Sequence, residues 1–188
     1  MMTKKKIYTT TIGSFPKPKY LPIIDWFDSA RGEDGMNTVK TTLEYTKYDE
    51  NKSSKDELLF LRAASEVINI QLKAGIDVPT DGEVRRENYI HYHCRHLEGF
   101  DFNNLEHRVL RDGAYETGLP AIRNQIKHTG KYYSSHDYLS SQAVSSNPVK
   151  FTIPGPLTIM DTTADCYYDN REKLNNDLAE TVNKEILN

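Results

Sequence analysis

The stretch Ile76-Asp77-Val78-Pro79-Thr80-Asp81-Gly82-Glu83 determines how we interpret the rest of the chain. Its first half is apolar and β-branched, which favours a strand, and the Asp-Gly pair favours a turn. The carboxylate of Glu83 comes directly after this turn, and Arg85 and Arg86 follow it in the sequence. Barrel and doubly wound α/β folds place functional groups on loops of this kind, where strands end. We therefore predict that Glu83 lies at the centre of a ligand pocket.

The segment before this strand predicts a helix. Ser54-Lys55-Asp56-Glu57 has the spacing of a capping box. The residues that follow on one helical face are Leu58, Leu61, Ser65, Ile68 and Leu72. Gly75 supplies the left-handed residue that ends a helix. Because residues 7–12 form a β-branched run before this helix, residues 7–82 predict strand, helix, strand, which is almost always a right-handed parallel crossover.

A third strand is predicted at residues 149–153, where a Pro-Gly-Pro turn stops a β-branched run. The excursion between the second and third strands, residues 81–148, is too long to be an ordinary connection. Within it we expect a helix at 87–97, a hairpin that pairs 108–110 with 121–127 across Asp112-Gly113, and a short helix from Asp137.

The remaining segments are predicted as follows. Residues 20–29 form a short helix, and residues 31–52 form a polar surface loop, either irregular or with helical turns. A last helix starts at Asn170, with an apolar stripe of Leu174, Leu178, Val182 and Ile186. This helix reaches the last residue without a stop signal, and no strand follows to cover its stripe, so we interpret the chain as cut.

Composition bounds the class of protein. With 188 residues, 21.6 kDa, a formal charge of −3 and a pI of about 6.1, the chain predicts a single α/β domain, residues 1–188. This charge balance gives no electrostatic case for binding nucleic acid or anionic membranes. No apolar run is long enough to span a membrane, and we expect a cytoplasmic protein. Cys94 and Cys166 are too few for a disulfide framework and are predicted to be reduced thiols.

Two conspicuous groups have alternative interpretations. His91, His93, Cys94 and His96 are metal-ligating residue types, but on a helix neighbours in sequence point in different directions. Packing or surface histidines with a buried thiol are therefore the default interpretation. Arg85 and Arg86 either steer an anionic cofactor or pair with Glu87 and Asp81.

Three segments together resemble the catalytic domain of cobalamin-independent methionine synthase. Thr9-Thr10-Thr11-Ile12-Gly13-Ser14-Phe15-Pro16 resembles its first strand, and Asp77 to Glu83 is similar to its second, which ends in a Gly-Glu pair. Val149 to Ile159, with its Gly-Pro turn, resembles the third. Each segment alone is a weak signal, but three in order, spanning nearly all of residues 7–160, are fairly specific.

The resemblance implies a (β/α)8 TIM barrel, of which this chain holds the first three strands, near residues 7–12, 76–80 and 149–153, and their helices. It implies a site at the carboxyl ends of these strands and methyl transfer to the thiol of homocysteine. By position, Ile12, Gly13 and Ser14 would hold the carboxylate of the amino acid, and Glu83 would accept hydrogen bonds from its ammonium group. These roles suit an anion that needs N–H donors and an ammonium that needs a charged acceptor.

The resemblance also implies a zinc ion that holds the thiol as a thiolate. The ligands of the family, a His-x-Cys pair, a Glu and a further Cys, would lie beyond residue 188, as would the catalytic histidine. This chain therefore offers no metal ligand and no identified catalytic residue. The methyl donor is either methyltetrahydrofolate or a methylcorrinoid carrier protein. A methylcorrinoid carrier fits at least as well as folate, because Met160-Asp161-Thr162-Thr163 lacks the tryptophan of the folate-binding members, and the Arg-Cys pair of their long excursion is absent here.

Two alternatives remain open at this stage. One keeps the fold but transfers an alkyl group to another small thiol, such as coenzyme M. The other is a truncated, non-catalytic chain that associates with itself or with a partner through its uncovered barrel edge.

Overall fold

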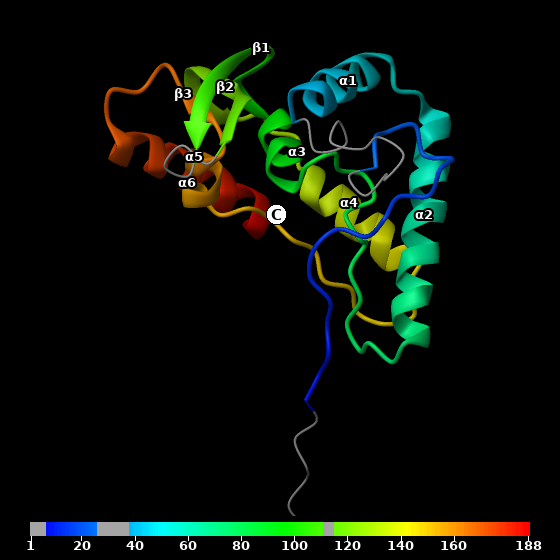
Figure 1. The fold of residues 1–188 in the computed structure, drawn as a ribbon. Helices are drawn as coiled ribbons and strands as arrows, with labels where there is room; N and C mark the ends of the chain where they lie inside the picture. Colours follow the sequence, from blue (N-terminus) through cyan, green and yellow to red (C-terminus); the bar gives the residue numbers. More distant parts are fainter. Residues whose placement is uncertain (1–6, 26–37, 111–114) are drawn as a thin grey trace, which may run out of the picture.

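The structure of the protein is a computed structural model that describes residues 7–25, 38–110 and 115–188. Figure 1 shows a mixed α/β architecture. Its elements are α1 (Thr38–Asn51), α2 (Ser54–Lys73), α3 (Tyr89–Arg95), β1 (Leu97–Leu110), β2 (Tyr115–His128), α4 (Tyr133–Ala143), α5 (Pro156–Asp161), β3 (Ala164–Asp165) and α6 (Arg171–Leu187). None of the described helices is both long and apolar enough to cross a membrane.

The three segments predicted as strands lie side by side and run parallel. A parallel bridge joins Thr10 to Val78, and another joins Thr80 to Lys150. The backbone N–H of Val78 donates to Thr9 O at 3.0 Å, and that of Lys150 donates to Pro79 O at 2.8 Å. Residues 76–80 are therefore the middle of the three segments, so the spatial order follows the order in the chain.

The predicted strands are nevertheless wrong as continuous strands, because each pair is held by a single isolated bridge. Two residues explain the short pairing. Pro79 has no N–H to donate, and the side chain of Asp77 accepts the backbone N–H of Thr9 at 3.0 Å in place of a ladder partner.

Helix α2 confirms the predicted helix but not its details. The capping box uses Ser53 and Asp56, one residue earlier than predicted, and the Asp56 carboxylate accepts the Ser53 N–H at 3.0 Å. Gly75 follows the helix with φ +85, as predicted. The buried face differs from the predicted one and consists of Phe60, Ala63, Ala64, Val67, Ile68 and Gln71.

Gln71 explains part of that difference, because it ties α2 to the middle segment. Its side-chain amide donates to Thr80 O at 2.8 Å and accepts the Thr80 N–H at 2.9 Å. A buried glutamine thus forms hydrogen bonds with both backbone groups of Thr80, which a purely apolar helix face would leave without a partner.

The long excursion contains a hairpin that is much longer than predicted, and the predicted pairing is wrong, because residues 108–110 pair with 115–117 while 121–128 pair with 97–101. β1 and β2 pair antiparallel from Leu97 opposite His128 to Leu110 opposite Tyr115, and β3 adds a short parallel edge to β2. The predicted turn at Asp112-Gly113 lies outside the described residues. The preceding helix, α3, is shorter than the predicted 87–97 and ends at Arg95, two residues before β1 begins. Helix α4 begins four residues before the predicted start at Asp137.

Three other expectations need correction. Most of the predicted surface loop at residues 31–52 is helix α1, whose Tyr45 and Thr42 are buried. Residues 20–25 form turns and bends, not a helix, and residues 26–29 lie outside the described part. In α6 the stripe that was predicted to be uncovered is largely covered, because Leu174, Leu178 and Val182 pack into the core and only Ile186 of the four is exposed, at 64%.

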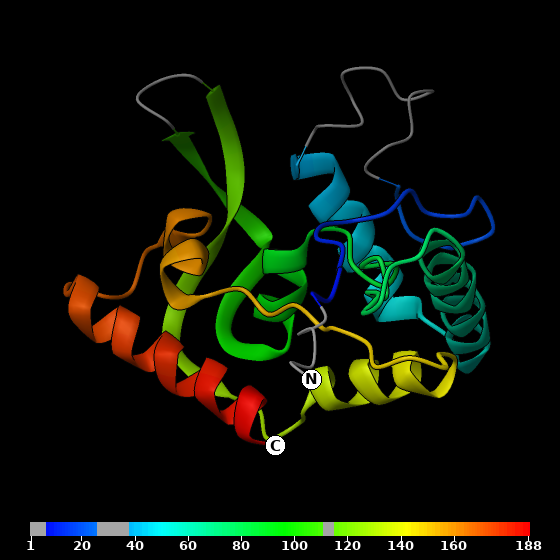
Figure 2. The same ribbon diagram turned by 90° about the horizontal axis from the view of Figure 1, so that it is seen from below.

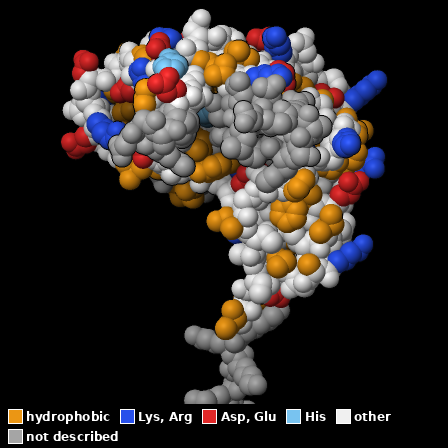
Figure 3. All heavy atoms as spheres, viewed as in Figure 1, with side chains coloured by type: hydrophobic (Ala, Val, Ile, Leu, Met, Phe, Trp, Pro, Cys, Tyr) orange, Lys and Arg blue, Asp and Glu red, His pale blue; other side chains and the backbone are white. Residues whose placement is uncertain are grey.

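The core has two parts, separated by α3. One part packs α3, the hairpin, α5 and α6 together, and the other packs α1, α2 and the segment after Glu83. Figure 2 shows α6 and the hairpin on one side of α3, with α1 and α2 on the other. In Figure 3 the outline of the molecule is concave between the part that holds α6 and the part that holds α2. Hydrophobic side chains lie along this concave side.

Candidate functional site

Ser14 and Glu83, predicted to act together, are in direct contact. The Ser14 hydroxyl donates to Glu83 Oε2 at 2.5 Å, although the two residues lie 69 positions apart in the sequence. Glu83 is 6% exposed. The backbone N–H of Phe15 also donates to Gly82 O at 3.0 Å, so the loops after the first and second segments are joined directly.

The backbone of Glu83 adopts a left-handed conformation with φ 56, and no other described residue apart from glycines has a positive φ. Such a backbone is costly for a residue with a Cβ, and it persists where the surroundings enforce it. Here the Glu83 N–H donates to Asp81 Oδ1 at 3.0 Å, and the Glu83 carbonyl accepts the Arg86 N–H at 3.0 Å. Both backbone groups of the strained residue are therefore satisfied.

The third segment also reaches this site. The Thr152 hydroxyl donates to Glu83 Oε1 at 3.2 Å, and Arg86 Nη1 donates to the Thr152 hydroxyl at 2.9 Å. The loops at the ends of all three parallel segments thus meet at one carboxylate.

Ile12 and Gly13 form the open side of the site. Ile12 is 87% exposed, and a side-chain atom built on Gly13 would meet nothing within 4 Å. Gly13 has φ +87, a conformation that glycine adopts without cost. The structure therefore places Ile12, Gly13, Ser14 and Glu83 in one region, with the glutamate at the buried end and the glycine at the open end.

A buried lysine shares this environment. Lys17 is 6% exposed, and burial lowers the pKa of its ammonium group, while the carboxylates of Asp25 and Glu83 raise it. On the other side, burial raises the pKa of Asp81, and the Arg86 guanidinium lowers it. Glu83 thus shares its buried surroundings with two buried cations, Lys17 and Arg86.

The two consecutive arginines point to different places. Arg86 lies 3.8 Å from Asp81 and is buried, which confirms one of the predicted pairs. Glu87, however, pairs with Arg95 at 2.6 Å. Arg85 forms two hydrogen bonds with Glu57 on α2, at 2.7 and 2.5 Å, so its charge is neutralised by the scaffold.

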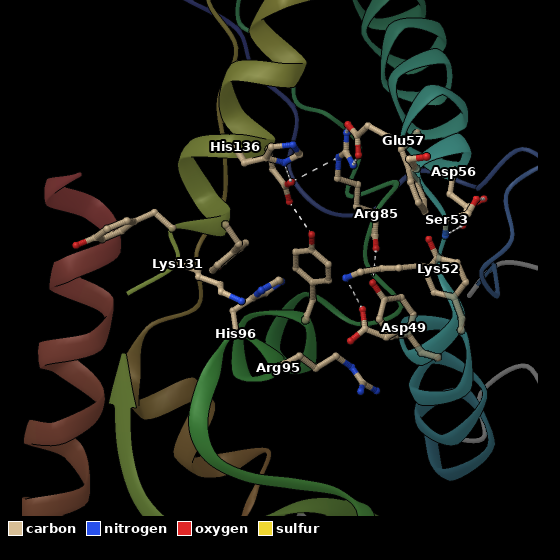
Figure 4. A pocket seen from close by; sticks show the side chains of 18 of the residues that line it. Asp49, Lys52, Ser53, Asp56, Glu57, Arg85, Arg95, His96, Lys131 and His136 are labelled. Atoms are coloured by element: carbon tan, nitrogen blue, oxygen red, sulfur yellow. Dashed lines mark hydrogen bonds and ion pairs between the residues drawn. The ribbon is translucent and has the colours of Figure 1, made fainter. Parts of the chain in front are cut away.

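Arg85 lines a cavity of about 730 Å³, which Figure 4 shows between α1, α2, α3 and α4 and whose lining includes neither Ser14 nor Glu83. Its charged residues are Asp49, Lys52, Asp56, Glu57, Arg85, Arg95, Lys131 and Asp137. In Figure 4 His136 and Glu57 approach the region of Arg85 from opposite helices. The lining holds as many carboxylates as cations, and several of them form ion pairs with each other. The cavity therefore favours neither an anionic nor a cationic ligand.

The histidine cluster is explained by packing. His91 and His93 are buried, and burial lowers their pKa values to about 4 and about 3 respectively. His93 Nδ1 lies 2.7 Å from the Tyr133 hydroxyl, and the ring of His96 stacks on that of Tyr133. Burial also raises the pKa of the Cys94 thiol. This part of the sequence builds the core around α3.

No group of three or more histidine, cysteine, aspartate or glutamate side chains in the described ranges is arranged to hold a metal ion. The described residues therefore do not fit the zinc ion that the resemblance implies.

Sequence reasoning missed Lys17 and Thr152. Thr152 carried a usable signal, because it lies directly before the turn that ends the third segment, where functional groups of parallel α/β folds gather. Lys17, between Pro16 and Pro18, resembles an exposed lysine in a loop, and nothing in the sequence indicates its burial.

The chain is similar to known methionine synthases and matches a family model. Residues 7–188 match the family described as "Cobalamin-independent synthase, Catalytic domain". A methionine synthase of Sulfolobus acidocaldarius is 29% identical over 96% of this chain and 47% of its own length, and one from Saccharolobus islandicus is 30% identical with 48% of its length covered.

Among solved structures, a B12-independent methionine synthase from Shewanella sp. W3-18-1, in complex with selenomethionine, is 26% identical with a TM-score of 0.70. The alignment covers 95% of this chain and 47% of that one, and the two folds are similar. The chain thus spans about half the length of the relatives it matches. On these grounds it belongs to the family of cobalamin-independent synthase catalytic domains.

Proposed function

We propose that this chain is the part of a methyltransferase that binds the amino-acid end of homocysteine, whose thiol receives the methyl group. The observation that carries the proposal is the contact between Ser14 and Glu83 where neighbouring parallel segments end. Family membership supports the reaction class. The selenomethionine in the Shewanella relative supports an amino-acid ligand of this size.

The architecture that we propose is the first three strands of a (β/α)8 barrel with their helices, residues 1–188 forming one domain. Three parallel segments in chain order, with α2 before the second and α4 before the third, support it. In such a barrel the loops that carry Ser14 and Glu83 belong to the catalytic rim.

The site residues would divide the ligand between them. The ammonium group donates to the Glu83 carboxylate, which has acceptor positions beyond those used by Ser14 and Thr152. The ligand carboxylate lies against the open loop of Ile12, Gly13 and Ser14 and accepts from its N–H groups. The Ser14 hydroxyl has one proton, so on binding it turns from Glu83 to the ligand carboxylate and frees an acceptor for the ammonium group.

The methyl-transfer step lies outside these residues. We propose that its zinc ligands follow residue 188, and that the methyl donor is methyltetrahydrofolate or a methylcorrinoid carrier protein. The residues described here bind and orient the amino-acid end, and they identify neither the donor nor a catalytic group.

Calorimetry with L-methionine tests the proposed site without a methyl donor. L-methionine should bind, and 4-(methylthio)butanoate, which lacks the ammonium group, should bind more weakly. Glu83→Gln should weaken L-methionine binding by about 1.5–3 kcal/mol, the usual contribution of a hydrogen bond to a charged group, and leave the desamino compound unchanged. The matched control is Glu98→Gln, at an exposed glutamate on β1. Equal binding of both compounds to wild type and Glu83→Gln would contradict the proposal.

The same titration separates the coenzyme M alternative. Coenzyme M has a thiol but no ammonium group, so the buried Glu83 carboxylate would have no partner on it. We expect homocysteine to bind more tightly than coenzyme M. Tighter binding of coenzyme M would favour the alternative.

We also propose that the isolated chain associates with itself through its uncovered edge. A groove of about 540 Å³ between α4 and α6 is lined by Tyr138, Leu139, Phe151, Ile153 and Ile186. Leu139 and Ile186 are more than 60% exposed. Size-exclusion chromatography at rising concentration should show a dimer that Leu139→Asp weakens, and a monomer at every concentration would contradict this.

A further inference from the structure

The Glu83 carboxylate is held by a chain of polar groups that begins at Arg86. We propose that Arg86 and Thr152 are positioning residues that fix this carboxylate for the ammonium group of an amino-acid ligand. The inference rests on the function proposed above and extends the site to the third parallel segment.

The direction of the hydrogen bonds follows from the chemistry of the groups. A guanidinium has only donors, so Arg86 Nη1 must donate to the Thr152 hydroxyl oxygen, 2.9 Å away, and to the Thr152 carbonyl, 3.0 Å away. Because the hydroxyl oxygen accepts this bond, its own proton is directed to Glu83 Oε1 at 3.2 Å. Arg86 thereby determines which way the Thr152 hydroxyl points.

The carboxylate is consequently gripped on both oxygens. Thr152, from the third segment, donates to Oε1, and Ser14, from the first, donates to Oε2. Two donors from opposite sides define the plane of the carboxylate. When Ser14 turns to the ligand carboxylate, the bond from Thr152 still holds Oε1, so the ammonium group meets a preoriented acceptor at Oε2 and is spared the cost of ordering a flexible side chain.

Arg86 is built into the core as a fixed support. It is 2% exposed, and its guanidinium lies 4.3 Å from the centre of the Phe151 ring. Its Nη2 is 3.8 Å from Asp81 Oδ2, while Asp81 Oδ1 accepts the Glu83 N–H. Among the described residues, Nε and Nη2 have no hydrogen-bond partner, so the side-chain hydrogen bonds of this buried arginine are directed at Thr152.

A pair of substitutions at Thr152 tests the role of its hydroxyl. Thr152→Val removes the hydroxyl at nearly constant volume, and Thr152→Ser keeps it. Calorimetry should show L-methionine bound about tenfold more weakly by Thr152→Val, with Thr152→Ser close to wild type and 4-(methylthio)butanoate unaffected by either. Thr163→Val is the matched control, because this buried hydroxyl donates to Ile159 O, away from Glu83. If Thr152→Val does not fold, as judged by circular dichroism, Thr152→Ala takes its place.

The two neighbouring arginines give a second comparison. Arg86→Lys cannot place donors on both Thr152 oxygens, so it should weaken L-methionine binding as Thr152→Val does. Arg85→Lys, whose partner is Glu57, should leave L-methionine binding near wild type. The double variant Arg86→Lys/Thr152→Val should bind no more weakly than either single one, because both break the same chain.

The outcomes distinguish the two proposals. Wild-type affinity in Thr152→Val, together with weakened binding in Glu83→Gln, would overturn the positioning role and leave the ammonium site intact. Equal loss of L-methionine and 4-(methylthio)butanoate binding in Thr152→Val would show general damage and would also overturn it. If neither Glu83→Gln nor Thr152→Val changes the affinity for L-methionine, the proposed function itself is overturned.

Discussion

The left-handed backbone of Glu83 links local strain to the proposed role of its side chain. A non-glycine residue in this conformation costs about 1–3 kcal/mol. The hydrogen bonds to Asp81 and Arg86 offset part of this cost, and the conformation turns the carboxylate towards Ser14 and Thr152. Strain that is retained at the one point where three loops meet is typical of a site whose geometry matters more than its local stability.

Gly82 is predicted to be the least tolerant glycine of this region. In Gly82→Ala the new Cβ would lie 2.6 Å from Val67 Cγ1 and 3.1 Å from Phe15 Cβ, in a backbone with φ +66. Gly75→Ala is the matched control, because Gly75 has φ +85 but open space around it. We expect Gly75→Ala to lower the free energy of unfolding by about 1–2 kcal/mol, and Gly82→Ala by at least about 1 kcal/mol more. Urea unfolding measures both, and equal losses would show that the clash is relieved by a small shift.

Individual residues were predictable where strand ends decide their position. Ser14 and Glu83 follow β-branched runs, so their approach could be inferred from the parallel crossover. The positions of the Arg85 and Arg86 side chains could not be predicted in full, because adjacent residues leave a turn in different directions. Only the packing of the folded chain places Arg86 beside Phe151 and Arg85 beside Glu57. The burial of Lys17 depends on contacts with distant carboxylates, which no local pattern encodes.

At the scale of elements, periodicity succeeded where helices bury many large apolar residues. α2 and α6 were predicted with the correct start within one residue, since each has both a cap and an apolar face. α1 was missed because its buried face includes Thr41, Thr42 and Tyr45. Threonine is polar, so these positions do not produce the apolar periodicity that predicts a helix. The hairpin was underestimated because its strands carry many charged residues, such as the exposed Glu98, Arg123 and Lys127, among their apolar ones.

The cap of α6 provides a test at this scale. The Asn170 side chain accepts the backbone N–H groups of Glu172 at 2.9 Å and Lys173 at 3.1 Å. Asn170→Ala should lower the free energy of unfolding by about 1 kcal/mol, and Asn170→Asp should retain most of it. Thermal denaturation of the three proteins measures the effect. An alanine variant as stable as wild type would mean that the first turn of α6 is frayed in solution.

For the whole molecule, the buried histidines predict a loss of stability in mild acid. His91 and His93 are held neutral, with pKa values of about 4 and about 3 against an ordinary value of 6.5. Below pH 6.5 the unfolded chain therefore binds protons that the folded chain does not, and stability falls as the pH drops towards 4. Each histidine should contribute about 2 kcal/mol of loss between pH 7 and pH 5.

Urea unfolding at pH 7 and pH 5 measures this loss. His91→Gln should remove about half of the histidine contribution, whereas His107→Gln, at an exposed histidine on β1, should change nothing. The difference between variants isolates the imidazole from carboxyls such as Asp81, whose raised pKa acts in the opposite sense. The same pH dependence in wild type and His91→Gln would show that His91 is not buried in solution.

The bonds from Ser14 and from Thr152 to Glu83 each join residues 69 positions apart. Each bond therefore closes a long loop, and the contacts around Glu83 exist only after both closures have lost their chain entropy. A partly folded chain lacks these contacts, so a ligand held by the loops of Ser14 and Glu83 binds only the complete fold. At a concentration of 100 times its dissociation constant, that ligand would raise the stability of the whole domain by about 2.7 kcal/mol, and a shift in melting temperature would serve as a binding assay.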